Sequence, residues 1–133
     1  MKPGIPVLAL TLCAAPALAQ SPMSAEAFED YATGKTLIYG ESGMAYGAEQ
    51  YLPGRRVIWT FLDGACRRGE WYEKAEQICF RYEHAPDDPQ CWTFFRSQTG
   101  LTARFENDPQ ARILVEVEKS TEPLICPGPK VGV

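Results

Sequence analysis

The chain lacks the residue patterns that common enzyme and metal-binding classes need. It has one histidine, His84, in 133 residues, and no Cys-x-x-Cys or Cys-His pairing of the kind that holds zinc. The nearest approach to a Gly-x-Ser-x-Gly nucleophile elbow, Gly40–Gly43, is one residue short and lies between expected strands, not before a helix. A serine hydrolase would also depend on His84 as its base. We therefore assign no catalytic residue, no metal site and no cofactor.

Basic residues and long apolar runs are also scarce. Thirteen lysines and arginines stand against 17 aspartates and glutamates, a formal net charge of -4. That balance argues against nucleic acid or an anionic membrane as a partner. No stretch after residue 19 approaches the roughly 18 apolar residues of a membrane-spanning helix, so we expect no membrane span. Internal repeats and low-complexity tracts are absent as well.

The first 19 residues have the three regions of a secretory signal peptide. Lys2 gives the basic start, Ile5–Ala15 the apolar run, and Ala17-Leu18-Ala19 the small-residue end that a signal peptidase reads. We therefore expect residues 1–19 to be a signal peptide. Residues 20–133 are long enough for one domain, which we expect to be periplasmic or secreted.

The remaining residues predict one short helix followed by strands. Ser24–Ala32 has acidic residues in its N-terminal half and apolar residues at helical spacing. Eight segments with strand patterns, separated by turn residues, follow at 35–39, 46–52, 55–61, 65–73, 77–82, 90–96, 101–105 and 113–119. Their short connections predict a mainly β fold, an antiparallel meander of about eight strands that forms a curled sheet or a small barrel.

An even number of cysteines remains after residue 19: Cys66, Cys79, Cys91 and Cys126. In a small exported domain this predicts two disulfides, for which three pairings are possible. If 77–82 and 90–96 form a hairpin in which paired residue numbers sum to 170, Cys79 lies opposite Cys91, close enough for a disulfide. The favoured pairing is therefore Cys79 with Cys91 and, by elimination, Cys66 with Cys126.

In that register, the strand pair has one face for the core and one for the disulfide. Ile78, Phe80, Trp92 and Phe94 share the first face, which we expect to be buried. The Cys66–Cys126 disulfide would hold the proline-rich end of the chain against the fourth strand. This would keep the segment ordered although it has no sheet pattern of its own.

Two sets of polar residues could do chemistry, and each has a simpler interpretation. His84 lies beside three carboxylates and could act as a base or a metal ligand, but a solvated histidine in a polar hairpin loop is the favoured interpretation. The carboxylates of Asp63, Glu70, Glu73 and Glu76 could supply the acid pair of a glycosidase. Their spacing in the sequence does not establish the distance between them in the fold. The simpler explanation is that these carboxylates lie on solvated turns and strand faces.

Aromatic residues are the most informative group. The chain has 3 tryptophans, 6 tyrosines and 6 phenylalanines, and none of them lies in residues 1–19. This number of aromatic residues exceeds what one face of a small sheet needs, so some of them could form a binding site. The alternative is that all of them belong to a large aromatic core. Tyrosine and tryptophan are favoured at contact surfaces. The candidate binding residues are therefore Tyr39, Tyr46, Tyr51, Trp59, Trp71 and Trp92.

The chain also resembles a family through its turn glycines, cysteines and tryptophans. These motifs are Gly34-Lys35-Thr36-Leu37, Asp63-Gly64-x-Cys66, Gly69-x-Trp71, Ile78-Cys79-Phe80, Gln90-Cys91-Trp92 and Cys126-Pro127-Gly128-Pro129. Their pattern resembles that of short uncharacterised exported proteins of alphaproteobacteria with a Trp/Cys-rich antiparallel β domain. The resemblance covers most of residues 20–133 and implies no known activity. More loosely, the size and crosslinks are similar to those of periplasmic lysozyme and protease inhibitors.

These features lead to three functional hypotheses. The first is a non-catalytic periplasmic binding module for an envelope protein or a small apolar ligand, inhibitor-like in the protein case. The second is a structural or assembly protein of the envelope that docks through the tail Pro127–Val133. The third is a small hydrolase using His84 or a carboxylate pair. An open apolar cavity with a few convergent polar groups would favour a small-molecule site, and a packed interior would favour a surface-acting protein.

Overall fold

The computed structural model describes residues 1, 20–108, 110 and 112–126. Residues 2–19 of the expected signal peptide and the expected docking tail, residues 127–133, lie outside this described part. The elements are α1 (Ala25–Ala32), β1 (Thr36–Glu41), β2 (Met44–Leu52), β3 (Arg56–Thr60), β4 (Arg67–Lys74), β5 (Gln77–Tyr82), β6 (Gln90–Ser97), β7 (Gly100–Phe105) and β8 (Ile113–Ser120). No helix among the described residues is long and apolar enough to cross a membrane.

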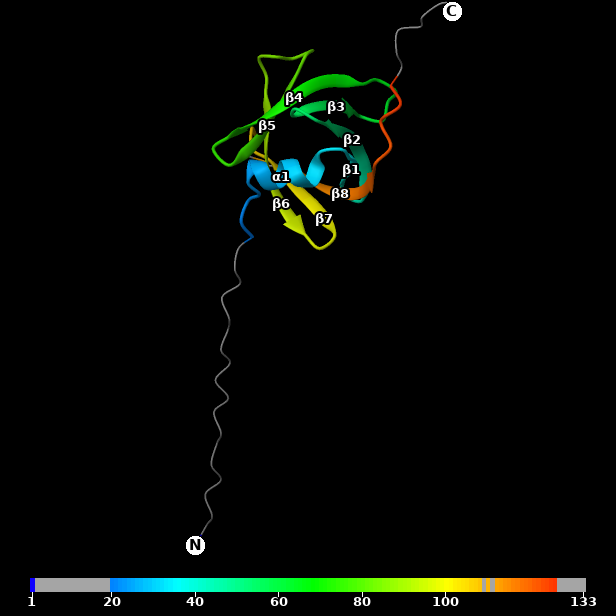
Figure 1. The fold of residues 1–133 in the computed structure, drawn as a ribbon. Helices are drawn as coiled ribbons and strands as arrows, with labels where there is room; N and C mark the ends of the chain where they lie inside the picture. Colours follow the sequence, from blue (N-terminus) through cyan, green and yellow to red (C-terminus); the bar gives the residue numbers. More distant parts are fainter. Residues whose placement is uncertain (2–19, 109, 111, 127–133) are drawn as a thin grey trace, which may run out of the picture.

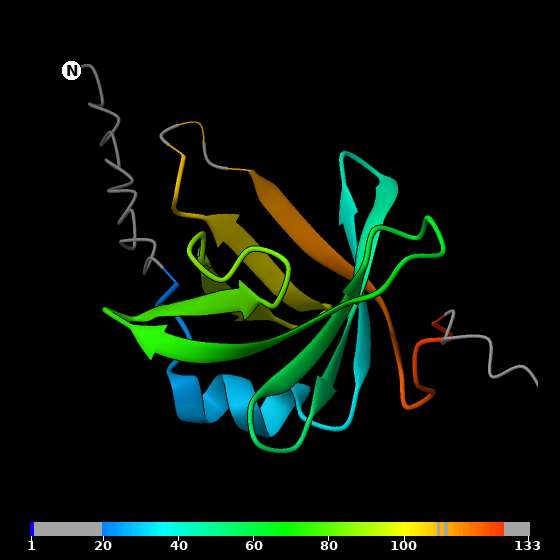
Figure 2. The same cartoon turned by 90° about the horizontal axis from the view of Figure 1, so that it is seen from above.

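The strands form a closed antiparallel barrel (Figures 1 and 2). Each strand pairs with the next in the chain, and β8 pairs with β1, so no strand remains at an edge. All eight predicted strands are present, with ends within two residues of those expected. The mainly β prediction is confirmed, and of the two forms it allowed the barrel is the one adopted.

Helix α1 lies across one end of the barrel (Figure 2). It begins where the Ser24 side chain accepts a hydrogen bond from the Ala27 N–H, and it ends before Gly34, whose φ of 85° suits glycine. Its inner face buries Phe28, and the Tyr31 hydroxyl donates to the Glu116 carboxylate of β8 at 2.7 Å. The helix thus closes this end through both apolar and polar contacts.

Both predicted disulfides are present. Cys79 pairs with Cys91 across β5 and β6 in the predicted register, and Cys66 bonds to Cys126 across a sequence separation of 60. Cys79 is 0% exposed, so its side of this disulfide is buried. The Cys91 N–H donates a hydrogen bond to the Asn107 side chain at 2.8 Å.

A β-bulge in β2 alters which of its side chains point inward. Tyr39 pairs with Gly47 and Gly40 with Ala45, so Tyr46 is the extra residue between the two pairs. In contrast, β4 pairs regularly with both of its neighbours. Gly69 of β4 provides room for β5, because a Cβ at this position would lie 2.5 Å from the Arg81 carbonyl oxygen.

Candidate functional site

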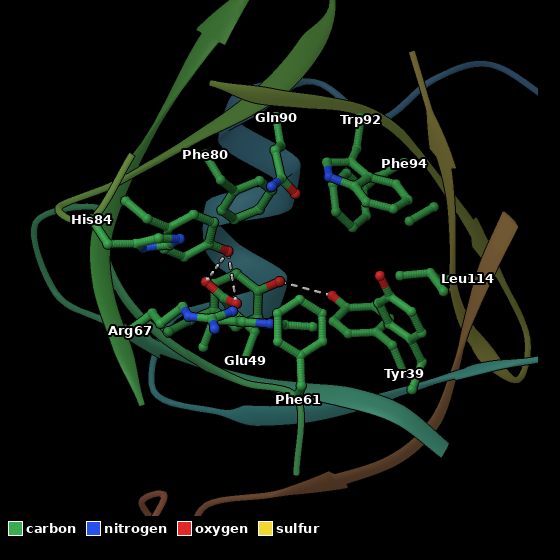
Figure 3. A pocket seen from close by; sticks show the side chains of 15 residues that line it. Tyr39, Glu49, Phe61, Arg67, Phe80, His84, Gln90, Trp92, Phe94 and Leu114 are labelled. Atoms are coloured by element: carbon green, nitrogen blue, oxygen red, sulfur yellow. Dashed lines mark hydrogen bonds between the residues drawn. The ribbon is translucent and has the colours of Figure 1, made fainter. Parts of the chain in front are cut away.

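The barrel interior contains a cavity of about 80 Å³ (Figure 3). It opens toward the surface, because Phe61 and His84 at its mouth are exposed. A vestibule of about 660 Å³ shares four lining residues with it: Tyr46, Phe61, Gln90 and Trp92. The full lining is Tyr39, Tyr46, Glu49, Tyr51, Trp59, Phe61, Arg67, Phe80, Tyr82, His84, Gln90, Trp92, Phe94, Ala103 and Leu114.

The strands place these side chains by alternation, with one exception in β2. Glu49 and Tyr51 are two residues apart and line the cavity together, as the period of a strand requires. Tyr46 would point outward in a regular strand, because it is an odd number of residues from Glu49. The bulge at Tyr46 shifts the pleat and allows both side chains to reach the cavity.

Aromatic rings form two walls of the cavity. Tyr46, Trp59 and Phe61 make one wall, with ring centroids 5.3–6.0 Å apart. On the other wall, Phe80 and Tyr82 stack with centroids 6.4 Å apart. Such rings present flat, rigid surfaces that bind apolar or cationic groups at low entropic cost.

Gly47 gives Trp59 the space it needs in the first wall. A Cβ on Gly47 would lie 2.2 Å from the Trp59 ring and 2.8 Å from the Thr60 carbonyl oxygen. The ring cannot stay in place beside an alanine. We expect Gly47→Ala to lower the free energy of unfolding by about 1–3 kcal/mol through overpacking and to shift the Trp59 emission spectrum.

Urea denaturation and tryptophan fluorescence would measure both effects. Gly43→Ala is a useful comparison, because a Cβ there meets no atom within 4 Å and only its φ of 79° is strained. A Gly47→Ala protein with unchanged stability and emission would show that β2 and β3 are not packed this closely.

A buried carboxyl group, Glu49, lies in the middle of the cavity wall (Figure 3). It is 2% exposed, and both of its oxygens accept from the Tyr82 hydroxyl, at 3.1 and 3.2 Å. Burial raises the pKa of Glu49 well above its ordinary value, and the Tyr82 hydrogen bond offsets this only in part. Burial therefore disfavours the ionised form of Glu49 in the ligand-free protein.

Two further tyrosines share a hydrogen bond inside the barrel. The hydroxyls of Tyr39 and Tyr51 are 2.8 Å apart, and either one can donate. Burial is the main cause that raises the pKa of each well above 10. Both remain neutral at physiological pH and can donate or accept a hydrogen bond.

Basic and amide groups are confined to the cavity mouth. The Arg67 guanidinium stacks on the Phe61 ring at 4.9 Å, and the side chains of His84 and Gln90 complete this region (Figure 3). Arg112 reaches the vestibule, where it contacts the Tyr46 hydroxyl and pairs with Glu41 at 3.1 Å. The site is thus acidic and aromatic inside and basic at its opening.

Five of the six candidate binding residues line this cavity: Tyr39, Tyr46, Tyr51, Trp59 and Trp92. Trp71 does not. Its ring packs on Phe28 of α1 with centroids 5.2 Å apart, and Arg55 covers it at 4.4 Å. Trp71 therefore belongs to the closed end of the barrel.

The four candidate glycosidase carboxylates, Asp63, Glu70, Glu73 and Glu76, are all exposed and none lines the cavity. Glu70 is engaged by Arg81, and Asp63 accepts a hydrogen bond from the Ala65 N–H. His84 lies at the cavity mouth, on the loop after β5. Among the described residues, no three His, Cys, Asp or Glu side chains gather so as to hold a metal ion.

Glu49 is the residue that sequence reasoning missed. Its signal was its position two residues before Tyr51, on the same face of an expected strand as this candidate binding residue. A carboxylate on a core-facing position is unusual enough to mark a site.

Comparison with known proteins gave no match to any family model, curated protein or solved structure. The resemblance to exported alphaproteobacterial proteins therefore stays a prediction, and the function must be argued from the cavity itself.

Proposed function

We propose that this protein is an exported binding module that holds a small, largely apolar ligand inside its barrel. The observation that carries the proposal is the open, aromatic cavity with a few convergent polar groups, which is the usual form of a small-molecule site. Between the two ligand classes expected from the sequence, a small molecule suits such a cavity better than a protein surface does.

The rest of the structure supports the same proposal. Two disulfides and a helix across one end favour a rigid, preformed pocket, which loses little entropy on binding. Disulfides also persist in oxidising compartments, so the periplasm or the extracellular space is the proposed location. The polar groups in the cavity pair with each other, as in Glu49 with Tyr82, and form no nucleophile–base pair. Binding without catalysis is the simplest activity for this arrangement.

A contact role in the envelope is a second candidate, supported by the outer face of β8. Ile113, Val115 and Val117 alternate along this strand and are 46%, 40% and 55% exposed. An apolar stripe of this kind marks a surface for protein contact. Of these three residues, Val115 and Val117 line neither the cavity nor the vestibule, so a partner bound there would leave the cavity free.

Filling the cavity is the direct test of the proposal. Ala103 is 2% exposed and lines the cavity, so Ala103→Phe would occupy ligand space. We expect it to weaken binding at least 10-fold for whichever member of a panel of small neutral, anionic and cationic aromatic compounds binds the wild type. Thr102→Phe is the matched control, because the neighbouring residue of β7 does not line the cavity.

Tryptophan fluorescence and native mass spectrometry would report binding, since Trp59 and Trp92 line the site. Two results would refute the proposal. One is the absence of any bound compound from the panel or from an envelope extract. The other is equal binding by the Ala103→Phe and Thr102→Phe proteins.

A further inference from the structure

We propose that the ligand is a small organic cation, an ammonium group on an apolar body, with the Glu49 carboxylate as its counter-ion. The inference rests on the proposed binding function and names the chemical class that the same cavity would take. Four features of the site carry it: the incomplete bonding of Glu49, the absence of a cation beside it, the aromatic walls and the distribution of charge.

The Glu49 carboxyl group has hydrogen-bonding capacity that the described residues do not use. A carboxylate offers about four lone-pair positions, yet the two oxygens of Glu49 share the single proton of the Tyr82 hydroxyl. Because Glu49 lines the cavity, its unused lone pairs are available to a ligand. A ligand with N–H or C–H donors on a positive nitrogen would bond to them.

No cationic side chain pairs with Glu49 in the described part of the chain. The ion pairs there join Arg55 to Glu29, Arg81 to Glu70, Arg104 to Glu106 and Arg112 to Glu41, and Glu49 is in none of them. Buried charges are paired, because an isolated carboxylate is strongly destabilised away from water. An external cation would supply the partner that Glu49 needs when it ionises.

Aromatic rings surround the position where the cation would lie. Trp59 is directly opposite Glu49 in the β2–β3 register, and Tyr51 and Tyr82 line the same cavity. The faces of such rings carry partial negative charge and attract ammonium groups, most strongly when water is excluded. Only a cation can pair with the ionised carboxylate of Glu49, because a neutral ligand brings no opposite charge and an anion is repelled by the ionised form.

The basic groups of the site lie near its mouth. Arg67 is partly exposed and held over Phe61, and His84 is exposed, so solvent screens both from an ammonium group at depth. The titratable groups of the cavity wall are Tyr39 of β1, Tyr46, Glu49 and Tyr51 of β2, Arg67 of β4, Tyr82 of β5 and His84 after it. The lining side chains of β3, β6, β7 and β8 do not titrate.

Cation binding should be coupled to loss of a proton. Burial raises the pKa of Glu49, so its carboxyl group in the free protein keeps a proton to higher pH than a solvated carboxyl group does. When a cation binds, that proton leaves to solvent and the carboxylate pairs with the ligand, so the charge inside the cavity is unchanged. A neutral ligand would bind without this exchange.

Three probes of similar size separate the ligand classes: 2-phenylethylammonium, 2-phenylethanol and phenylacetate. At pH 8 we expect the wild type to bind the cation at least 10-fold more tightly than either of the other two. Glu49→Gln keeps the size and an acceptor for Tyr82 but removes the charge, and it should abolish this preference. Glu70→Gln is the control, because this exposed carboxylate lies outside the cavity and should leave the preference intact.

Isothermal titration in buffers of different ionisation enthalpy provides a test on the wild type alone, should the Glu49→Gln protein fail to fold. We expect protons to be released when the cation binds and none to be released with 2-phenylethanol. If 2-phenylethanol or phenylacetate binds as tightly as the cation, or Glu49→Gln keeps the preference, the cation inference is overturned while binding in the cavity stands. If none of the three probes binds, the cation inference fails, and the Ala103→Phe panel decides the proposed function separately.

Discussion

Replacing Phe28 by alanine is expected to lower the free energy of unfolding by about 3–5 kcal/mol. The Phe28 ring is 0% exposed and is the main contact between α1 and the inside of the barrel. Its centroid lies 4.5 Å from that of Phe94 and 5.2–5.5 Å from those of Trp71 and Tyr51. Alanine would leave a void among these rings, and rigid strands on every side cannot collapse to fill it.

Phe95→Ala is the matched control for this variant. Phe95 is the residue after Phe94 in β6, is only partly buried, and lies beneath Arg104 at 5.4 Å. We expect its loss to cost about 1 kcal/mol, as for partial burial of an aromatic side chain. Guanidinium denaturation would give both values. Similar costs for Phe28→Ala and Phe95→Ala would show that α1 is not an essential part of the barrel core.

The Phe28 variant also connects stability to the binding site. Tyr51, Phe80 and Phe94 contact the Phe28 ring and line the cavity as well. The helix is therefore the floor of the site as well as the closure of the barrel. Loss of the ring would deepen the cavity, so the variant should accept longer ligands than the wild type where it remains folded.

Much of this fold was predictable because its information is local in the sequence. Period-2 alternation and turn residues identify each strand, and the hairpin register places Cys79 opposite Cys91. Closure of the barrel is different. It depends on pairing β1 with β8, as in Thr36 with Ser120, and no local pattern distinguishes that pairing from an open curled sheet.

The candidate site was predictable in part for the same reason. Aromatic content and alternation pointed to Tyr39, Tyr51 and Trp59, since strand period alone puts such residues on inner faces. Trp71 has the same pattern but lies next to α1, and only the position of the helix along the barrel axis separates it from the cavity. Glu49 was missed because a lone carboxylate in a strand usually faces water, and its burial depends on neighbours from other strands.

Unfolding free energy measured against pH should reveal the buried Glu49. The pKa of Glu49 is raised well above the ordinary value of 4.5 by burial. At pH values between the Glu49 pKa of the unfolded chain and that of the folded protein, the folded protein holds a proton that the unfolded chain has lost. The contribution of Glu49 to stability is therefore greatest below about pH 4.5 and falls as pH rises, by up to about 1.4 kcal/mol per pH unit, until Glu49 ionises in the folded state.

Other shifted groups act outside this interval. Hydrogen bonding from Thr93 lowers the pKa of Glu106, which changes stability in the opposite direction and only below about pH 4.5. Burial raises the pKa of Tyr31 to about 12, and burial also raises the pKa values of the cavity tyrosines above 10, so these act in alkali. The contribution of Glu49 to the free energy of unfolding is therefore best measured between pH 5 and pH 9.

The Glu49→Gln protein isolates the contribution of this one group. Glutamine cannot ionise, so the variant should lose the downward slope between pH 5 and pH 9 and become more stable than the wild type toward the alkaline side. Urea denaturation at half-unit steps of pH would give the two curves. Parallel curves would mean that Glu49 ionises at the same pH in the folded and unfolded chains, as a solvated carboxylate would. A wild-type slope that flattens when 2-phenylethylammonium is added would show that the cation takes over the stabilisation that the proton provides in the free protein.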